Sequence, residues 1–158
     1  MSKISKKLTI PKNKILLAFT VMLFCFFNLC NAKRILPTVE IDLYLKKDEV
    51  VYARVVASKD SQSVSAMKDF TMRWTLYRND GLVVLVRYDK YPYHFVLYRD
   101  YSQNRFTLNL LDPQGINRDL SQPRLHIEFV GIDNPFNDEK TVAHIRIYGF
   151  GDMDFTRQ

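Results

Sequence analysis

The sequence predicts an all-β fold: an antiparallel two-sheet β-sandwich of immunoglobulin-like type with about eight strands, preceded by a cleavable signal peptide. Three observations predict it. Segments of alternating polar and apolar residues recur along residues 33–158, turn residues separate them roughly every 8 to 12 residues, and no segment keeps the 3.6-residue apolar period of a helix.

The first 32 residues have the pattern of an export signal. Five lysines precede an apolar run from Ile15 to Cys30, and Cys30 and Ala32 place small side chains at the −3 and −1 positions that a signal peptidase reads. The run is shorter than the ~20 residues that a membrane-spanning helix needs, which favours cleavage. A retained signal-anchor and a lipoprotein attached through Cys30 remain alternatives. The chain therefore divides into a signal peptide at residues 1–32 and a single domain at residues 33–158.

The domain opens with two predicted strands. Residues 38–46 alternate strictly, with apolar Val39 and Ile41 on one face and acidic Glu40 and Asp42 on the other. Residues 49–57 are rich in valine, which favours a strand. Residues 58–68 are polar and predict a loop.

The middle of the domain reads as four strands separated by turns. Trp74 lies in an alternating segment that ends at Asn79-Asp80-Gly81, a hairpin signal because these residues tolerate positive φ. Residues 82–86 are apolar at every position, which predicts a central strand covered on both faces. Trp74 is expected in the core of the sandwich. The remaining strands of this part are expected at residues 93–99 and 105–111, the latter before the turn Asp112-Pro113-Gln114-Gly115.

Two further strands close the predicted domain. They are expected at residues 124–129 and 141–149, with a longer loop over residues 131–140 between them.

The cysteines and charges indicate the compartment and exclude one class of partner. Both cysteines, Cys25 and Cys30, lie in the export segment, and the chain contains no Asn-x-Ser/Thr acceptor. These features, with the lysine-rich start, favour a bacterial envelope protein in the periplasm, with secretion or membrane anchoring as alternatives. Residues 33–158 carry 18 basic and 17 acidic residues that are interleaved along the chain. Nucleic-acid binding, which needs a clustered basic face, is not expected, and membrane contact is expected only through an uncleaved N-terminal segment.

Aromatic residues are densest around residues 88–101. Tyrosine and arginine are enriched at protein interfaces because they contribute much contact area at low entropic cost. The candidate partner-binding residues are Tyr88, Tyr91, Tyr93, Arg99 and Tyr101. Half-buried tyrosines are also ordinary in strands, so a purely structural role is the alternative.

Three polar residues near the end of the chain form a weak candidate metal site. If the last two strands pair so that Glu128 faces His144, then His126 faces Arg146, and all four share one face. His126, Glu128 and His144 then resemble a zinc ligand set, although no spacing motif supports it. We therefore expect no metal and no cofactor.

Two functions follow from these patterns. The first is a non-enzymatic protein-protein interaction or assembly module that uses a strand edge or the tyrosine-rich loops. The alternative is a domain that binds a glycan or small ligand through tyrosine rings. No motif for nucleophilic catalysis is present, so an enzyme is not expected.

Overall fold

The computed structural model describes residues 36–58, 67–100, 102–115, 122–137 and 139–158. The proposed signal peptide, residues 1–32, lies outside the described residues. Nine strands form in the described part of the chain. They are β1 (Val39–Lys46), β2 (Val51–Ala57), β3 (Met67–Arg78), β4 (Gly81–Tyr88), β5 (Tyr91–Tyr98), β6 (Arg105–Asn109), β7 (Arg124–Asp133), β8 (Val142–Phe150) and β9 (Met153–Arg157).

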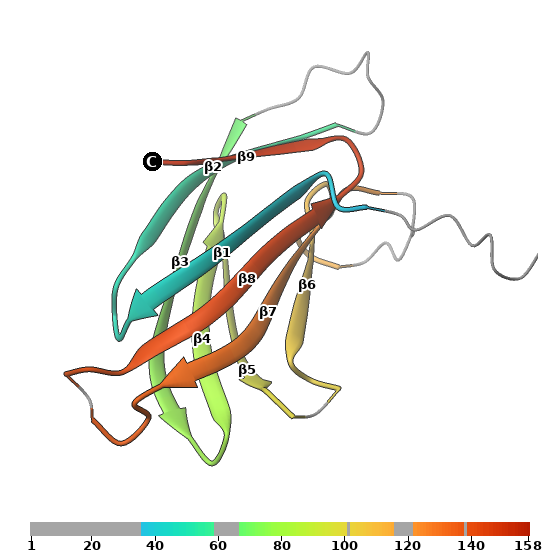
Figure 1. Ribbon diagram of the computed structural model, residues 1–158. Helices are drawn as coiled ribbons and strands as arrows, with labels where there is room; N and C mark the ends of the chain where they lie inside the picture. Colours follow the sequence, from blue (N-terminus) through green and yellow to red (C-terminus); the bar gives the residue numbers. More distant parts are fainter. Residues whose placement is uncertain (1–35, 59–66, 101, 116–121, 138) are drawn as a thin grey trace, which may run out of the picture. The chain divides into compact units, whose positions relative to one another are not determined.

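The strands make two antiparallel sheets that pack face to face (Figure 1). One sheet has four strands in the order β1-β8-β7-β6, and the other has five in the order β5-β4-β3-β2-β9. The all-β prediction and its two antiparallel sheets are confirmed. Among the described residues, no helix is long and apolar enough to cross a membrane.

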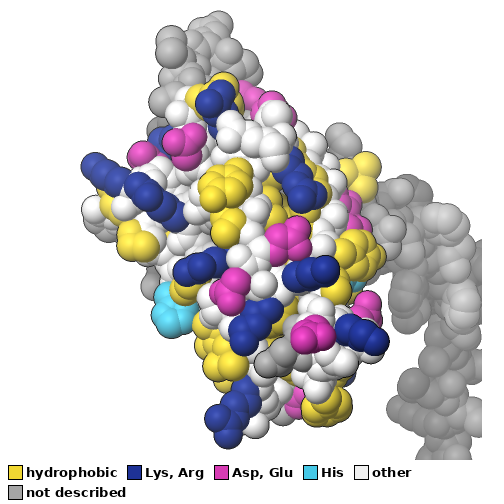
Figure 2. Space-filling view, turned by 90° about the vertical axis from the view of Figure 1, so that its left-hand side faces the viewer, with side chains coloured by type: hydrophobic (Ala, Val, Ile, Leu, Met, Phe, Trp, Pro, Cys, Tyr) yellow, Lys and Arg dark blue, Asp and Glu magenta, His cyan; other side chains and the backbone are white. Residues whose placement is uncertain are grey.

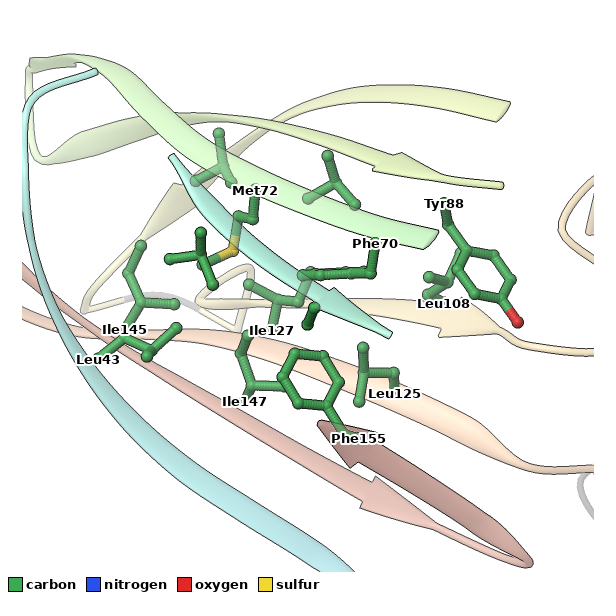
Figure 3. Close-up of a cluster of buried hydrophobic side chains, with 14 of the residues drawn as sticks. Leu43, Phe70, Met72, Tyr88, Leu108, Leu125, Ile127, Ile145, Ile147 and Phe155 are labelled. Carbon is green, nitrogen blue, oxygen red and sulfur yellow. The ribbon is translucent and has the colours of Figure 1, made fainter. Parts of the chain in front are cut away.

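The core lies between the inner faces of the two sheets. Alternate residues of each strand point inward, as the period-two pattern requires, and Figure 3 shows side chains from both sheets directed toward one another. Trp74 is buried, as expected, and its indole N–H donates to the carbonyl of Leu45 in β1 at 2.9 Å. Tyr88 forms a second polar link, because its hydroxyl donates to the carbonyl of Leu110 at 3.1 Å. Both large rings therefore lie in the core with their polar atoms satisfied.

The turn between β3 and β4 has the predicted form. Asn79 and Asp80 both adopt positive φ, at 50° and 59°, which suits the primed turns of two-residue hairpins. Gly81 follows because a Cβ there would lie 2.8 Å from Cγ1 of Val96 on β5.

Several predicted elements differ from the structure. The strand at residues 82–86 is not covered on both faces: Val83 and Leu85 are only half-buried and Arg87 is exposed. The expected loop at residues 131–140 begins later, because β7 continues to Asp133 past an irregularity between Phe129 and Gly131.

The prediction of about eight strands omitted β9. This strand pairs with β2 and places Met153 and Phe155 in the core. The expected loop at residues 58–68 is also shorter, since β3 begins at Met67, while residues 59–66 lie outside the described residues.

Candidate functional site

The predicted tyrosine surface begins with a correction at Tyr88. Its side chain is 1 % exposed and lies between the sheets, where burial raises the pKa of its hydroxyl. Inward alternation with Val84 and Val86 in β4 explains this position. Tyr88 is therefore a core residue and cannot contact a partner.

Tyr91 and Tyr93 lie at the start of β5 and are half-buried. The hydroxyl of Tyr93 donates to the carbonyl of Pro113 at 2.6 Å, and its ring packs near Phe106. The ring of Tyr91 lies 5.5 Å from Nζ of Lys90, and its hydroxyl accepts from Gln114 at 3.5 Å. Tyr91 is the more suitable of the two for contact with a partner, because the hydroxyl and ring of Tyr93 already contact Pro113 and Phe106.

Arg99 lies at the other end of β5. Its guanidinium pairs with the carboxylate of Asp100 through two bonds, at 3.2 and 3.1 Å, on the exposed surface. The eight residues of β5 begin at Tyr91 and end just before Arg99, so the two residues are roughly 25 Å apart at the usual rise. Tyr101 lies outside the described residues. Tyr91 and Tyr93 therefore lie at the opposite end of β5 from Arg99, and these three residues do not form a single patch.

The candidate metal residues share a face but not a site. The predicted register is wrong: Glu128 faces Arg146, and His126 faces Tyr148. His144 instead faces Gly131, because β7 continues to Asp133, which pairs with Val142, so that the turn comes later than expected.

Each of these side chains has its own partner. Glu128 accepts from the amide of Asn104 at 3.0 Å, His126 Nδ1 bonds the hydroxyl of Thr107 at 2.9 Å, and His144 Nε2 lies 2.9 Å from Asp42. In the part of the chain that the structure describes, no three His, Cys, Asp or Glu residues are grouped as a metal site.

The outer face of the four-stranded sheet is a closed polar network. Asp42 accepts from both His144 and Arg146, and these two contacts, His144 first, hold the pKa of Asp42 below its ordinary value. The ring of Tyr44 stacks on His144 at 4.5 Å. Most polar groups on this face already have partners, so it offers few free groups to a ligand.

His126 is the one strongly shifted histidine of this face. Burial, and then the charges of Arg105 and Arg124, lower its pKa to about 4. The ring stacks on Tyr148, with the ring centroids 5.0 Å apart. Because its pKa lies well below 7, His126 is neutral near pH 7.

The outer face of the five-stranded sheet differs from this network. It carries exposed apolar side chains together with exposed arginines, among them Arg54 and Arg78. A shallow hollow of about 420 Å³ lies over β3, β4 and β5. Tyr, Met and Arg are enriched at interfaces, and on this face they occur together with the exposed aspartate Asp69. The exposed apolar residues of this face are Val50, Tyr52, Met67, Leu76 and Val96.

The surface charges are mixed over the view in Figure 2. Lys and Arg side chains are interspersed there with Asp and Glu, and hydrophobic side chains lie between them. The view therefore shows no extended region of one sign.

Strand β5 is an exposed edge with an unusual composition. It pairs only with β4, and it is the one strand of the nine described that contains no Lys, Arg, Asp or Glu. Natural edge strands are commonly protected from pairing with other chains by charged residues. On β5 the protection is limited to Pro92, which lacks a backbone N–H.

The hairpin geometry shows which backbone groups of β5 point outward. The two-residue turn at residues 89–90 makes Tyr88 and Tyr91 the closing pair, which is hydrogen-bonded in such hairpins. Every second residue from Pro92 to Tyr98 then directs its N–H and C=O away from β4. The N–H of Tyr98 has this outward direction, because it donates to the carbonyl of Gln103 at 3.1 Å and not to β4. His94 and Val96 remain with their N–H and C=O at the open edge.

The other three edges are better protected. On β9 the N–H of Phe155 is occupied by the carboxylate of Asp154 at 2.9 Å. On β1 the carbonyl of Leu45 accepts from Trp74, and acidic residues line the outer face. β6 is only five residues long and begins with Arg105. The β5 edge, defined as the backbone and outward side chains of residues 92–98, is thus the most accessible pairing edge among the described residues.

The sequence predicts the strand that becomes β5, but it does not predict that this strand lies at the edge of its sheet. The absence of charge in residues 91–98 is visible in the sequence, whereas the edge position depends on the strand order.

Comparison with known proteins gives no match: no protein-family model matches the chain, and no curated protein or solved structure is significantly similar to it.

Proposed function

We propose that this chain is an exported protein of the bacterial envelope, most consistent with the periplasm, that acts as a non-enzymatic protein-protein interaction module. The β5 edge is its docking surface, and Tyr91 flanks it at one end. The export part of the proposal depends on the pattern of residues 1–32. No cofactor is needed for this role.

The observation that carries the proposal is the uncharged open edge. An unpaired strand offers a row of donors and acceptors that another extended chain can pair with. Val96, 41 % exposed, and His94 project from this edge onto the outer face. A partner strand therefore gains main-chain hydrogen bonds and an apolar contact without desolvating a charge on this chain.

The immunoglobulin-like part of the proposal concerns only the packing of two antiparallel sheets, because the strand order differs. Immunoglobulin sheets have the orders ABED and CFG, whereas here β2 to β5 follow one another within one sheet. An experimental structure with a search by topology tests this subtype.

The experiment for the function is site-specific photo-crosslinking in the native envelope. A photoreactive residue replaces Val96 at the edge, and a matched chain carries it at Leu76, which is similarly exposed but lies on β3 inside the sheet. We expect one defined protein adduct, identified by mass spectrometry, from position 96 and a much weaker one from position 76. Equal adducts from both positions, or none from position 96, contradict the proposal.

A glycan or small-ligand domain is the alternative, and the hollow over β3, β4 and β5 favours it. Its lining combines apolar Leu85 and Pro92 with the polar side chains of Arg73 and His94. Binding of a soluble oligosaccharide that shifts the amide resonances of Leu85 and His94, but not those of Tyr44, supports this alternative.

A further inference from the structure

We infer that the partner at the β5 edge is a second copy of this chain, so that two five-stranded sheets join through antiparallel β5 strands into one continuous sheet. This inference rests on the proposed use of the β5 edge. The two-fold axis passes beside Phe95, the residue midway between His94 and Val96.

The hydrogen bonds of the edge match themselves in this register. With Phe95 opposite its own copy, His94 faces Val96 of the second copy and each pair exchanges two bonds, giving four in total. The ladder ends beyond these pairs, because Pro92 has no N–H and the N–H of Tyr98 already donates to the carbonyl of Gln103. The N–H groups of His94 and Val96 are therefore the ones that the second copy pairs with.

The side chains of the edge are also compatible with their own copies. A two-fold axis brings each strand against its own sequence, so charged residues near the axis approach like charges. β5 has no Lys, Arg, Asp or Glu, and this repulsion does not arise.

An apolar row continues across the proposed junction. Leu76, Val83 and Val96 are aligned across β3, β4 and β5 on the outer face. Val96 lies at the end of this row, where the second copy covers it. Pairing therefore buries apolar surface that is exposed in the single chain.

Cysteine cross-linking tests the register. The full chain is prepared with Cys25→Ala and Cys30→Ala, and His94→Cys and Val96→Cys are introduced in separate chains. Facing residues of a hydrogen-bonded pair have Cα atoms about 5.5 Å apart, which suits a disulfide. Two copies of residue 96, or of residue 94, are offset by two residues along the strands and lie beyond the ~7 Å limit.

The mixture of the two chains should therefore give a disulfide-linked dimer under mild oxidation, and each chain alone should give at least about tenfold less. Equal cross-linking of each chain with itself overturns the register, and no cross-link in the mixture overturns the pairing.

Sedimentation equilibrium of the full chain tests the pairing without cysteines. Val96→Lys places a charge at the axis in both copies and should raise the dimer dissociation constant at least tenfold. The control Leu76→Lys makes the same change on β3, and should leave the dissociation constant within about threefold. A second variant, His94→Pro, removes one edge N–H per chain that is not bonded to β4, and should also weaken the dimer. Thermal unfolding checks that each variant is folded.

The two proposals fail in different ways. A wild-type chain that remains monomeric at high concentration overturns self-pairing. If position 96 then still forms an adduct with a different envelope protein, the docking function stands. If position 96 forms no adduct of any kind, both proposals fail.

Discussion

Two buried aromatic residues connect the sheets through hydrogen bonds. The indole of Trp74 reaches the carbonyl of Leu45, and the hydroxyl of Tyr88 reaches that of Leu110. A buried carbonyl without a donor is costly, so these residues stabilise the sandwich by more than their apolar area. Hydropathy alone predicts the burial of Trp74, but it does not predict that Tyr88 is interior.

Tyr88→Phe should lower the free energy of unfolding by about 1–2 kcal/mol, because the Leu110 carbonyl loses its donor while the ring remains packed. Urea unfolding measures this change. The matched variant Tyr52→Phe, at a side chain 55 % exposed, should change stability by less than about 0.5 kcal/mol. Equal effects for the two variants would show that Tyr88 is not held by this bond.

The pKa of His126 gives the fold a defined sensitivity to acid. Its folded value of about 4 lies below the ordinary value of 6.5, so the unfolded chain binds the proton more readily between these two values. The contribution of neutral His126 to the free energy of unfolding is therefore fully present above pH 6.5 and is lost as the pH falls toward 4. The pKa of Asp42 is lowered from 3.8, so its contribution is lost only at still lower pH.

NMR titration of the His126 ring should give a midpoint near 4 in the folded chain. Its contribution to acid destabilisation should be on the order of 1 kcal/mol, because the ring is only half-buried. Arg105→Met should raise the midpoint only partly, since burial is the larger cause. A wild-type midpoint at 6.5 would contradict the position of this ring.

At the scale of elements, β9 is the main feature that the sequence prediction omitted. Met153 and Phe155 alternate with polar residues, and Gly151 adopts a φ of 94° in the turn before them. The pattern covers only five residues at the end of the chain, and so short an alternation does not by itself distinguish a strand from a tail. What makes β9 a strand is pairing with β2 and the packing of Phe155 on Phe70.

Phe155→Ala should reduce the free energy of unfolding by about 3 kcal/mol through loss of buried area and the cavity left behind. Calorimetric or denaturant unfolding measures the loss. The neighbouring Thr156→Ala, at an exposed position, should have little effect. If Phe155→Ala is as mild as its control, β9 does not contribute to the core.

The register of β7 and β8 illustrates what periodicity cannot predict. Alternation correctly placed His126, Glu128, His144 and Arg146 on one face. The turn comes later than expected, with Asp133 paired to Val142, and an irregularity lies between Phe129 and Gly131; together they displace Glu128 and His126 by two positions from their expected partners. A hypothetical metal site built on pairing therefore failed, although the face was right.

At the scale of the whole molecule, alternation and turn residues were sufficient to predict two antiparallel sheets. Alternation and turn residues do not predict the strand order, because β1 pairs with β8 and β2 with β9, which are far apart in the sequence. The candidate site had the same limit, because only the strand order shows that β5 lies at an edge; the burial of Tyr88 follows from its alternation with Val84 and Val86 in β4. The charge pattern of an edge strand has meaning only once the edge is known.

The central claim is that the β5 edge is open in the single chain and becomes paired on association. Residue-resolved amide hydrogen exchange tests it most directly. In dilute protein the N–H groups of His94 and Val96 should exchange rapidly, while that of Phe95, directed at β4, is protected. At concentrations where the chain associates, His94 and Val96 should become protected as well. Protection of both in the dilute monomer, or rapid exchange of both in the associated form, would contradict the account.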